Sequence, residues 1–114
     1  MKKLQIITQL VFSETGISRK QMIAQDRRRE TVDARHLAMY LLAKHTNYTT
    51  TFIGAYLSRD HATTLHAKTK IRNMYDHDPL KQLADKLDKY CRELFMAVSE
   101  DEKRMLIGQL NLED

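Results

Sequence analysis

Small and polar side chains stand together at Asp60-His61-Ala62-Thr63. Asp60 can accept a hydrogen bond from the amino group of cytosine, and His61 can offer a ring nitrogen to a base edge. Ala62 and Thr63 can contact a thymine methyl group, and their small size lets a helix backbone enter the major groove. The free N–H groups of a helix N-terminus also favour nearby phosphate. We therefore expect this segment to begin a helix that can contact duplex DNA.

The flanking residues predict a helix-turn-helix over residues 49–75. Thr49 opens a short helix, Ser58-Arg59 forms a tight turn, and Asp60 is the N-cap of the following helix. The buried face of that second helix is expected to contain four apolar residues. These are Leu65, Ala67, Ile71 and Met74.

Other kinds of chemistry fit this segment poorly. His61 and His66 are five residues apart, so on a helix they diverge by about 140° and make a poor metal pair. Asp60 and His61 are adjacent and cannot face each other on a helix, and no oxyanion motif is visible. Asp60 is an N-cap in either interpretation, and base contact is an additional role. We expect no metal, no cofactor and no catalytic activity.

Hydrophobic periodicity predicts helices along the rest of the chain. Lys2 to Thr15 forms a helix that Gly16 ends, Ser18 caps a short helix to Ala24, and residues 25–30 form a basic loop. Thr31 and Asp33 are expected to cap the next helix, which ends near Thr46 with Asn47 as a left-handed terminator. Its apolar stripe consists of Ala34, Leu37, Ala38, Leu41 and Leu42.

The C-terminal part is also predicted to be helical. His77-Asp78-Pro79 interrupts the chain, and a helix follows from Leu80 to about Val98. Ser99 and Glu102 form a capping box for a last helix to Leu110. The side chains expected on one face of the first of these helices are Leu83, Leu87, Tyr90, Leu94 and Phe95. We expect this stripe to pack in the core rather than form a dimer seam, and the fold class to be all-α.

Composition limits the remaining possibilities. The 114 residues suit one domain, and 3 Gly and 1 Pro favour long helices with few connections. The single cysteine, Cys91, rules out an internal disulfide, is expected to be a buried apolar residue, and fits a reducing compartment such as the cytoplasm. No apolar run is long enough to span a membrane.

Charge is distributed unevenly. Residues 1–78 hold 13 Lys and Arg against 7 Asp and Glu, whereas residues 79–114 hold 6 against 8. A polyanion is therefore expected to bind the first part of the chain.

The central segment resembles the C-terminal DNA-binding domain of the bacterial replication initiator DnaA. That family carries Ile-Gly, a short spacer, Arg-Asp-His-Thr-Thr-Val-Leu-His-Ala and a closing Lys-Ile. The matching residues are Ile53-Gly54, Arg59-Asp60-His61, Thr63, Leu65-His66-Ala67 and Lys70-Ile71. Upstream, Ala34-Arg35 and residues 37–41 resemble its long helix, so the similarity covers about Leu4 to Phe95. It implies a compact Trp-repressor-like helical fold with an extra C-terminal helix.

The resemblance implies roles for particular residues. Arg27, Arg28 and Arg29 lie where the family has its basic loop, one arginine of which enters an A/T-rich minor groove. Asp60, His61, Ala62 and Thr63 match base-contacting positions, and Arg59 and His66 match neighbours that help hold DNA. Thr49, Thr50 and Thr51 match the start of the first helix, which meets the backbone.

This chain departs from the family pattern at several positions. Ala62 replaces the usual Thr or Ser, Thr64 replaces an expected Val, and Thr50-Thr51 replace a common Leu-Pro pair. The spacing between Gly54 and Arg59 is one residue shorter than in some members. These differences affect the expected base sequence more than the expected fold.

No Gly-x-x-x-x-Gly-Lys-Ser/Thr motif is present, so the chain has no P-loop for a nucleotide. Met1 and a tail beyond Phe95 favour a stand-alone relative over an excised domain. We expect residues 1–96 to form the DNA-binding domain and residues 97–114 a helical extension. The extension and the preceding helix could bind a protein partner or a second copy.

The leading hypothesis is a bacterial, sequence-specific double-stranded-DNA-binding protein that recognises sites like DnaA boxes. It would act in replication initiation at an origin or in its regulation. The alternative is a protein-interaction or oligomerisation module, or a transcriptional regulator, with a different or weak DNA site.

Overall fold

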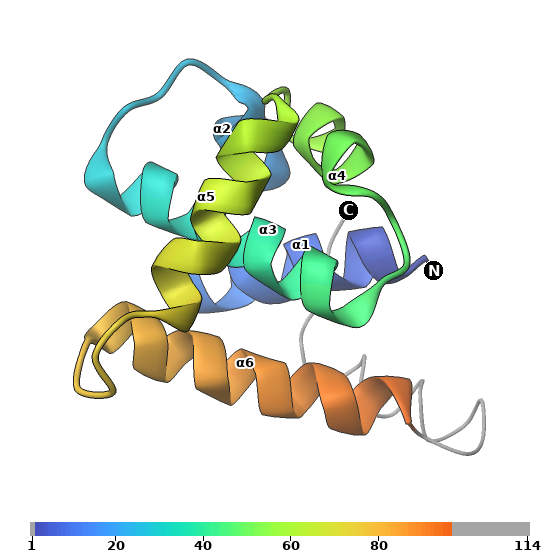
Figure 1. Ribbon diagram of the computed structural model, residues 1–114, viewed down its shortest axis with the longest axis vertical. Helices are drawn as coiled ribbons and strands as arrows, with labels where there is room; N and C mark the ends of the chain where they lie inside the picture. Colours follow the sequence, from blue (N-terminus) through green and yellow to red (C-terminus); the bar gives the residue numbers. More distant parts are fainter. Residues whose placement is uncertain (1, 97–114) are drawn as a thin grey trace.

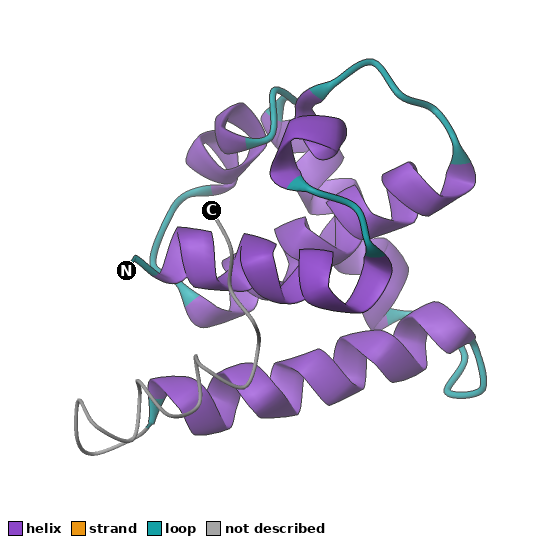
Figure 2. Ribbon diagram, turned by 180° about the vertical axis from the view of Figure 1, so that it is seen from behind, coloured by secondary structure: helices purple, strands orange, loops and turns teal. Residues whose placement is uncertain are grey.

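The computed structural model describes residues 2–96, which form six helices joined by loops and contain no strand (Figures 1 and 2). The helices are α1 (Lys3–Thr15), α2 (Arg19–Ile23), α3 (Arg29–His45), α4 (Thr50–Tyr56), α5 (His61–Arg72) and α6 (Pro79–Phe95). The all-α prediction is confirmed. The helix expected after Ser99 lies outside the described residues, as does the proposed extension 97–114.

Helix α3 is the central element, and all the other helices pack against it. The expected apolar stripe of α3 from Ala34 to Leu42 is buried, and Met39 joins it in the core. Helix α1 contributes Ile7, Leu10 and Val11 to the same cluster. Figure 1 shows α5 crossing in front of α3 and α6 lying below, at the C-terminal end of α5.

Most helix ends follow the local sequence signals. The hydroxyl of Thr49 accepts a hydrogen bond from the Phe52 N–H at 3.1 Å, and Asp60 Oδ1 accepts one from the Thr63 N–H at 2.9 Å. Ser18 caps α2, and Gly16 adopts the left-handed conformation with φ of 75° after α1. The caps predicted for these helices are confirmed.

The predicted end of α3 near Thr46 is confirmed, but its predicted start and the left-handed terminator are wrong. The helix begins at Arg29, before Thr31 and Asp33, whose side chains bond elsewhere: Thr31 donates to Asp26 and Asp33 accepts from Lys70. At the other end Asn47 is not left-handed, since the cap is Thr46 in an extended conformation with φ of −130°. The Thr46 hydroxyl donates to the Leu42 carbonyl at 2.6 Å.

The buried face of α5 differs from the prediction at one position. Leu65 is 46% exposed, whereas Thr64 is fully buried. Ala67 and Ile71 are buried as expected, and Thr64 is three residues before Ala67, so the three share the face toward α3. Leu65 points about 100° away from Thr64. Met74, beyond the end of α5, is only partly buried.

Helix α6 packs onto the core mainly through side chains four or three residues apart. Leu87, Cys91 and Leu94 are buried, which confirms the core role expected for the two leucines and for the cysteine. Burial raises the pKa of the Cys91 thiol to about 12, so it stays protonated. The helix starts at Pro79 and ends at Phe95, earlier at both ends than predicted. Leu83, Tyr90 and Phe95 are partly buried.

A buried carboxylate also fastens α6 to the end of α3. Asp88 lies 2.7 Å from His45 Nε2, 3.0 Å from Lys44 Nζ and 2.8 Å from an Arg92 nitrogen. These partners hold the pKa of Asp88 below its usual range although burial opposes them.

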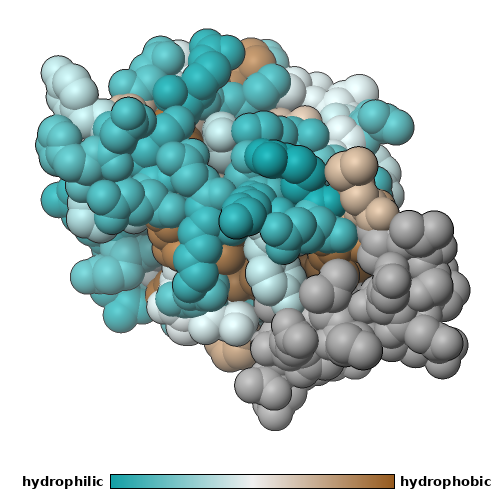
Figure 3. Space-filling model, turned by 90° about the horizontal axis from the view of Figure 1, so that it is seen from below, coloured by the Kyte–Doolittle hydropathy of each residue, from teal (hydrophilic) through white to brown (hydrophobic). Residues whose placement is uncertain are grey.

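The side of the molecule seen from below, where α6 lies, has a mostly hydrophilic surface with small hydrophobic areas (Figure 3). Within residues 2–96, every helix is too short or too polar to cross a membrane.

Gly54 allows α4 and the start of α5 to approach closely. A Cβ atom there would lie 2.6 Å from the carbonyl oxygen of Asp60 and 2.8 Å from that of Arg59. The Gly54 carbonyl accepts a hydrogen bond from the Arg59 N–H at 2.7 Å, which closes the turn. The turn between the two helices therefore requires glycine at this position.

Gly54→Ala is expected to destabilise the fold by about 3 kcal/mol, because the neighbouring atoms belong to the backbone and cannot rotate away. Gly16→Ala is the matched control: its Cβ would meet nothing within 4 Å, so only the left-handed conformation costs energy, about 1 kcal/mol. Urea unfolding of both variants measures the difference. Equal losses would contradict the close approach.

Candidate nucleic-acid interface

The N-terminal end of α5 is presented to solvent by a tight turn. Ser58 adopts a positive φ of 57° in this turn. His61 and Ala62 at the start of α5 are exposed, while Thr63 is half-buried and its hydroxyl donates to Asp60 at 3.0 Å. His66 is exposed one turn further along. His61, Ala62 and His66 therefore form an exposed strip on α5, beside the exposed carboxylate of Asp60, while Thr63 is partly covered.

Asp60 is both the N-cap of α5 and an exposed anion. The backbone N–H and the hydroxyl of Thr63 hold the pKa of its carboxyl below the usual range. The group is therefore ionised near neutral pH and acts only as a hydrogen-bond acceptor. That state suits acceptance from a cytosine amino group.

The first helix of the motif, α4, ends at the turn that leads to this strip. Thr49 uses its hydroxyl as the cap, Thr50 is half-buried and Thr51 is exposed. Tyr48 and Phe52 stack here with ring centroids 4.6 Å apart, and both remain partly exposed. Sequence reasoning did not anticipate this aromatic pair, because Tyr48 precedes the helix.

The three arginines of the basic loop occupy different environments. Arg28 forms an ion pair with Asp26 at 2.7 Å, and this pairing holds the pKa of the Asp26 carboxyl well below its usual range. Arg29 lies in the first turn of α3, 3.7 Å from Asp33, so the predicted loop ends earlier than residue 30. Arg27 is exposed, and within the described residues its side chain has no hydrogen-bond or ion-pair partner.

Two further arginines hold this loop to the rest of the motif. Arg35, only 5% exposed, donates to the carbonyl of Met22 at 2.7 Å and to that of Asp26 at 3.1 Å. Arg59 donates to the carbonyl of Ala24 at 2.8 Å. The loop is thus fastened to both α3 and the turn before α5. Contact of Arg59 with DNA stays a prediction.

A buried histidine, His36, joins α3 to Lys70 on α5. His36 Nδ1 lies 3.0 Å from Lys70 Nζ, and its ring meets the His66 ring edge-on at 5.6 Å. Lys70 can only donate, so Nδ1 of His36 accepts and the ring is neutral. Burial, with Lys70 and His66 nearby, lowers the pKa of His36 to about 4.

Sequence reasoning missed Arg35 and His36 as positioning residues. The signal was present, since both lie within the apolar stripe of a helix, where a polar residue needs internal partners. Within residues 2–96, no group of three or more His, Cys, Asp or Glu side chains could hold a metal ion.

Two packed helices joined by a tight turn, with an exposed polar helix start and an adjoining basic loop, define a helix-turn-helix domain. Residues 4–71 match the family described as the bacterial DnaA protein helix-turn-helix, and the chain belongs to this family. Membership supports binding of DNA.

The chain is similar to proteins called chromosomal replication initiator protein DnaA. It is 37% identical over 92 residues to that of Gloeobacter violaceus, which covers 75% of this chain and 21% of the relative. The corresponding match in Bacteroides fragilis is 42% over 55 residues, or 47% of this chain and 12% of the relative. The chain thus spans about a fifth of the length of these relatives or less. No solved structure matches it.

The neutral state of His36 makes the fold sensitive to acid. Its pKa of about 4 lies below the usual 6.5, so between these pH values the imidazole is protonated in the unfolded chain but neutral in the folded chain. Stability is therefore complete above pH 6.5 and is lost as the pH falls toward 4. Between pH 7 and 5 we expect a loss of about 2 kcal/mol from this group.

His36→Gln is the control, because glutamine can accept from Lys70 but does not titrate. Urea unfolding at pH 7 and pH 5 should show a smaller acid loss in the variant than in the parent. The same acid loss in both proteins would remove His36 as the source.

Proposed function

We propose that this chain binds duplex DNA sequence-specifically, with the start of α5 in the major groove and Arg27 in the adjacent minor groove. The observation that carries the proposal is the exposed strip at the start of α5, next to an arginine loop that Arg59 ties to the same turn. Figure 1 shows the loop between α2 and α3 beginning beside the N-terminal end of α5.

The chemistry of each group fits its proposed role. Asp60 accepts from a cytosine amino group, His61 offers a ring nitrogen to a base edge, and Ala62 contacts a thymine methyl. Arg27 is the loop arginine whose charge is uncompensated, so it is best suited to the negative potential of a narrow minor groove. The charge of Arg28 is neutralised by its ion pair with Asp26.

The biological role proposed is recognition of sites like DnaA boxes, in replication initiation or its regulation, in the bacterial cytoplasm. It is supported by family membership and by relatives called chromosomal replication initiators. The chain would act by occupying DNA, without a catalytic step and without a bound nucleotide. Contact with a protein partner or second copy through the C-terminal helices is the rival account.

Asp60→Asn and His61→Ala test the major-groove contact. Each is expected to weaken binding to the preferred duplex by about 1–3 kcal/mol and to relax the choice at one base, because a base-edge contact is lost. Asparagine still caps a helix, so stability should change little, whereas Asp60→Ala also costs about 1 kcal/mol of stability. The measurement is fluorescence anisotropy with the selected duplex and its single-base variants. Parent-like affinity and preference in both variants would support the interaction module instead.

Arg27→Ala tests the minor-groove contact. It is expected to weaken binding more for duplexes with A/T-rich flanks than for G/C-rich ones, because a narrow minor groove attracts arginine. Arg28→Ala is the matched control, since this arginine is paired with Asp26 and should show no flank dependence. The measurement is the affinity of each variant for duplexes with either kind of flank. Equal losses of affinity on both duplexes for Arg27→Ala would show that this residue does not bind in the minor groove.

A further inference from the structure

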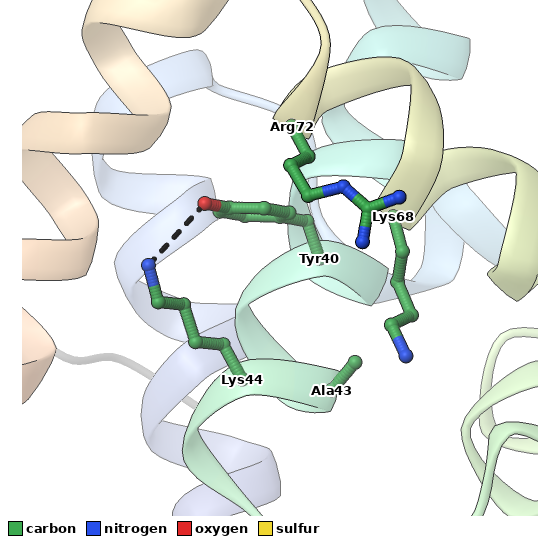
Figure 4. A pocket seen from close by; sticks show the side chains of 5 residues that line it. All are labelled: Tyr40, Ala43, Lys44, Lys68 and Arg72. Atoms are coloured by element: carbon green, nitrogen blue, oxygen red, sulfur yellow. Dashed lines mark hydrogen bonds between the residues drawn. The ribbon is translucent and has the colours of Figure 1, made fainter.

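A basic cleft lies between α3 and α5, apart from the residues of the proposed base contact. It has a volume of about 220 Å³ and is lined by Tyr40, Ala43, Lys44, Lys68 and Arg72 (Figure 4). Lys68 and Arg72 are four residues apart on α5, as are Tyr40 and Lys44 on α3, so each pair shares one helix face. Three of the five lining residues are cations and none is an acid.

The three cations of this cleft differ in whether another side chain of the protein binds their charged ends. Lys44 is held by Asp88 at 3.0 Å and by the Tyr40 hydroxyl at 3.4 Å. The side chains of Lys68 and Arg72 have no hydrogen-bond or ion-pair partner in the part of the chain that the structure describes. Figure 4 shows the Arg72 guanidinium and the Lys68 amine on one side of Tyr40, whose hydroxyl points to the other side, toward Lys44. Two like charges four residues apart repel each other, and an anion between them would relieve that repulsion.

The cleft lies on one flank of α5, and a second set of cations lies on the other. Lys70, two residues from Lys68, points to the opposite side and lines a hollow together with Arg27 and Arg29. Helix α5 thus has lysine side chains on both flanks; Lys70 forms an ion pair with Asp33 at 3.3 Å, and Arg27 supplies the uncompensated charge on that side. A helix inserted in a major groove runs between two phosphate backbones, so each flank faces one of them.

We propose that this cleft binds a phosphate of the DNA backbone, on the side of the major groove away from Arg27. The inference rests on the proposed function and adds a backbone contact made by the C-terminal half of α5, apart from the residues proposed to contact bases. Arg72 and Lys68 supply charge-assisted hydrogen bonds to the phosphate oxygens. The Tyr40 hydroxyl accepts from Lys44 and points away from these two cations, so Lys68 and Arg72 carry the contact (Figure 4). This contact positions the protein and carries no base preference.

The test is a double variant, Lys68→Ala with Arg72→Ala, measured by anisotropy against the preferred duplex between 50 and 200 mM salt. We expect affinity to fall about tenfold, equally on preferred and non-specific duplexes, and the salt slope to decrease by about 1–2. The control is Lys86→Ala with Lys89→Ala, which removes the same charge from exposed positions on α6. It should bind as the parent does.

Single methylphosphonate substitutions along both strands locate the contact. We expect one position, or two adjacent ones, where neutralising the phosphate weakens the parent but has no further effect on the double variant. If every position affects both proteins equally, or if the double variant keeps the parent's affinity and salt slope, the cleft does not bind backbone phosphate.

Two further outcomes separate the sources of phosphate and the two proposals. The first outcome is that micromolar nucleoside triphosphate shifts the Tyr40 NMR signals while no DNA phosphate position affects the parent and the double variant differently. That outcome would assign the cleft to a free phosphate compound and overturn the inference. Failure of this inference leaves the proposed function intact as long as the parent prefers one duplex and Asp60→Asn relaxes that preference. A parent without any such preference would overturn both.

Discussion

The relative position of the basic loop and α5 depends on two arginines that donate to backbone carbonyls at the end of α2. Arg35 reaches Met22 and Asp26 from α3, and Arg59 reaches Ala24 from the turn before α5. Burial and the nearby Arg59 lower the pKa of Arg35, so the arrangement pays a desolvation cost. Several charge-assisted hydrogen bonds offset that cost and fix the loop in one place.

A second constraint acts on α5 itself. Thr64, Ala67 and Ile71 face α3, and the first two are small enough to bring the helices close together. The missing side chain at Gly54 does the same between α4 and the turn. Close packing on one side leaves His61 and Ala62 on the outside, so the exposed strip is a direct consequence of the core.

Features with a local cause could be predicted from the sequence. The caps at Ser18, Thr49 and Asp60 depend on hydrogen bonds within three residues, and the stripe on α3 depends on helical periodicity alone. Most candidate contact residues could also be named, because the segment from residue 53 to residue 71 resembles one family closely.

Features with a tertiary cause could not be predicted. The burial of Thr64 instead of Leu65 depends on which face of α5 meets α3. The pairing of His36 with Lys70 likewise joins residues 34 positions apart. Periodicity cannot decide between two adjacent faces when a short helix has few apolar residues.

Arg35 and Arg59 hold the loop and α5 together, and we propose that the two contact DNA as one unit. Selection from a pool of randomised duplexes measures this most directly. We expect one enriched site, in which a major-groove sequence and an A/T-rich stretch occur at a single fixed spacing. Enriched sites with variable spacing between the two parts, or no enrichment at all, would contradict it.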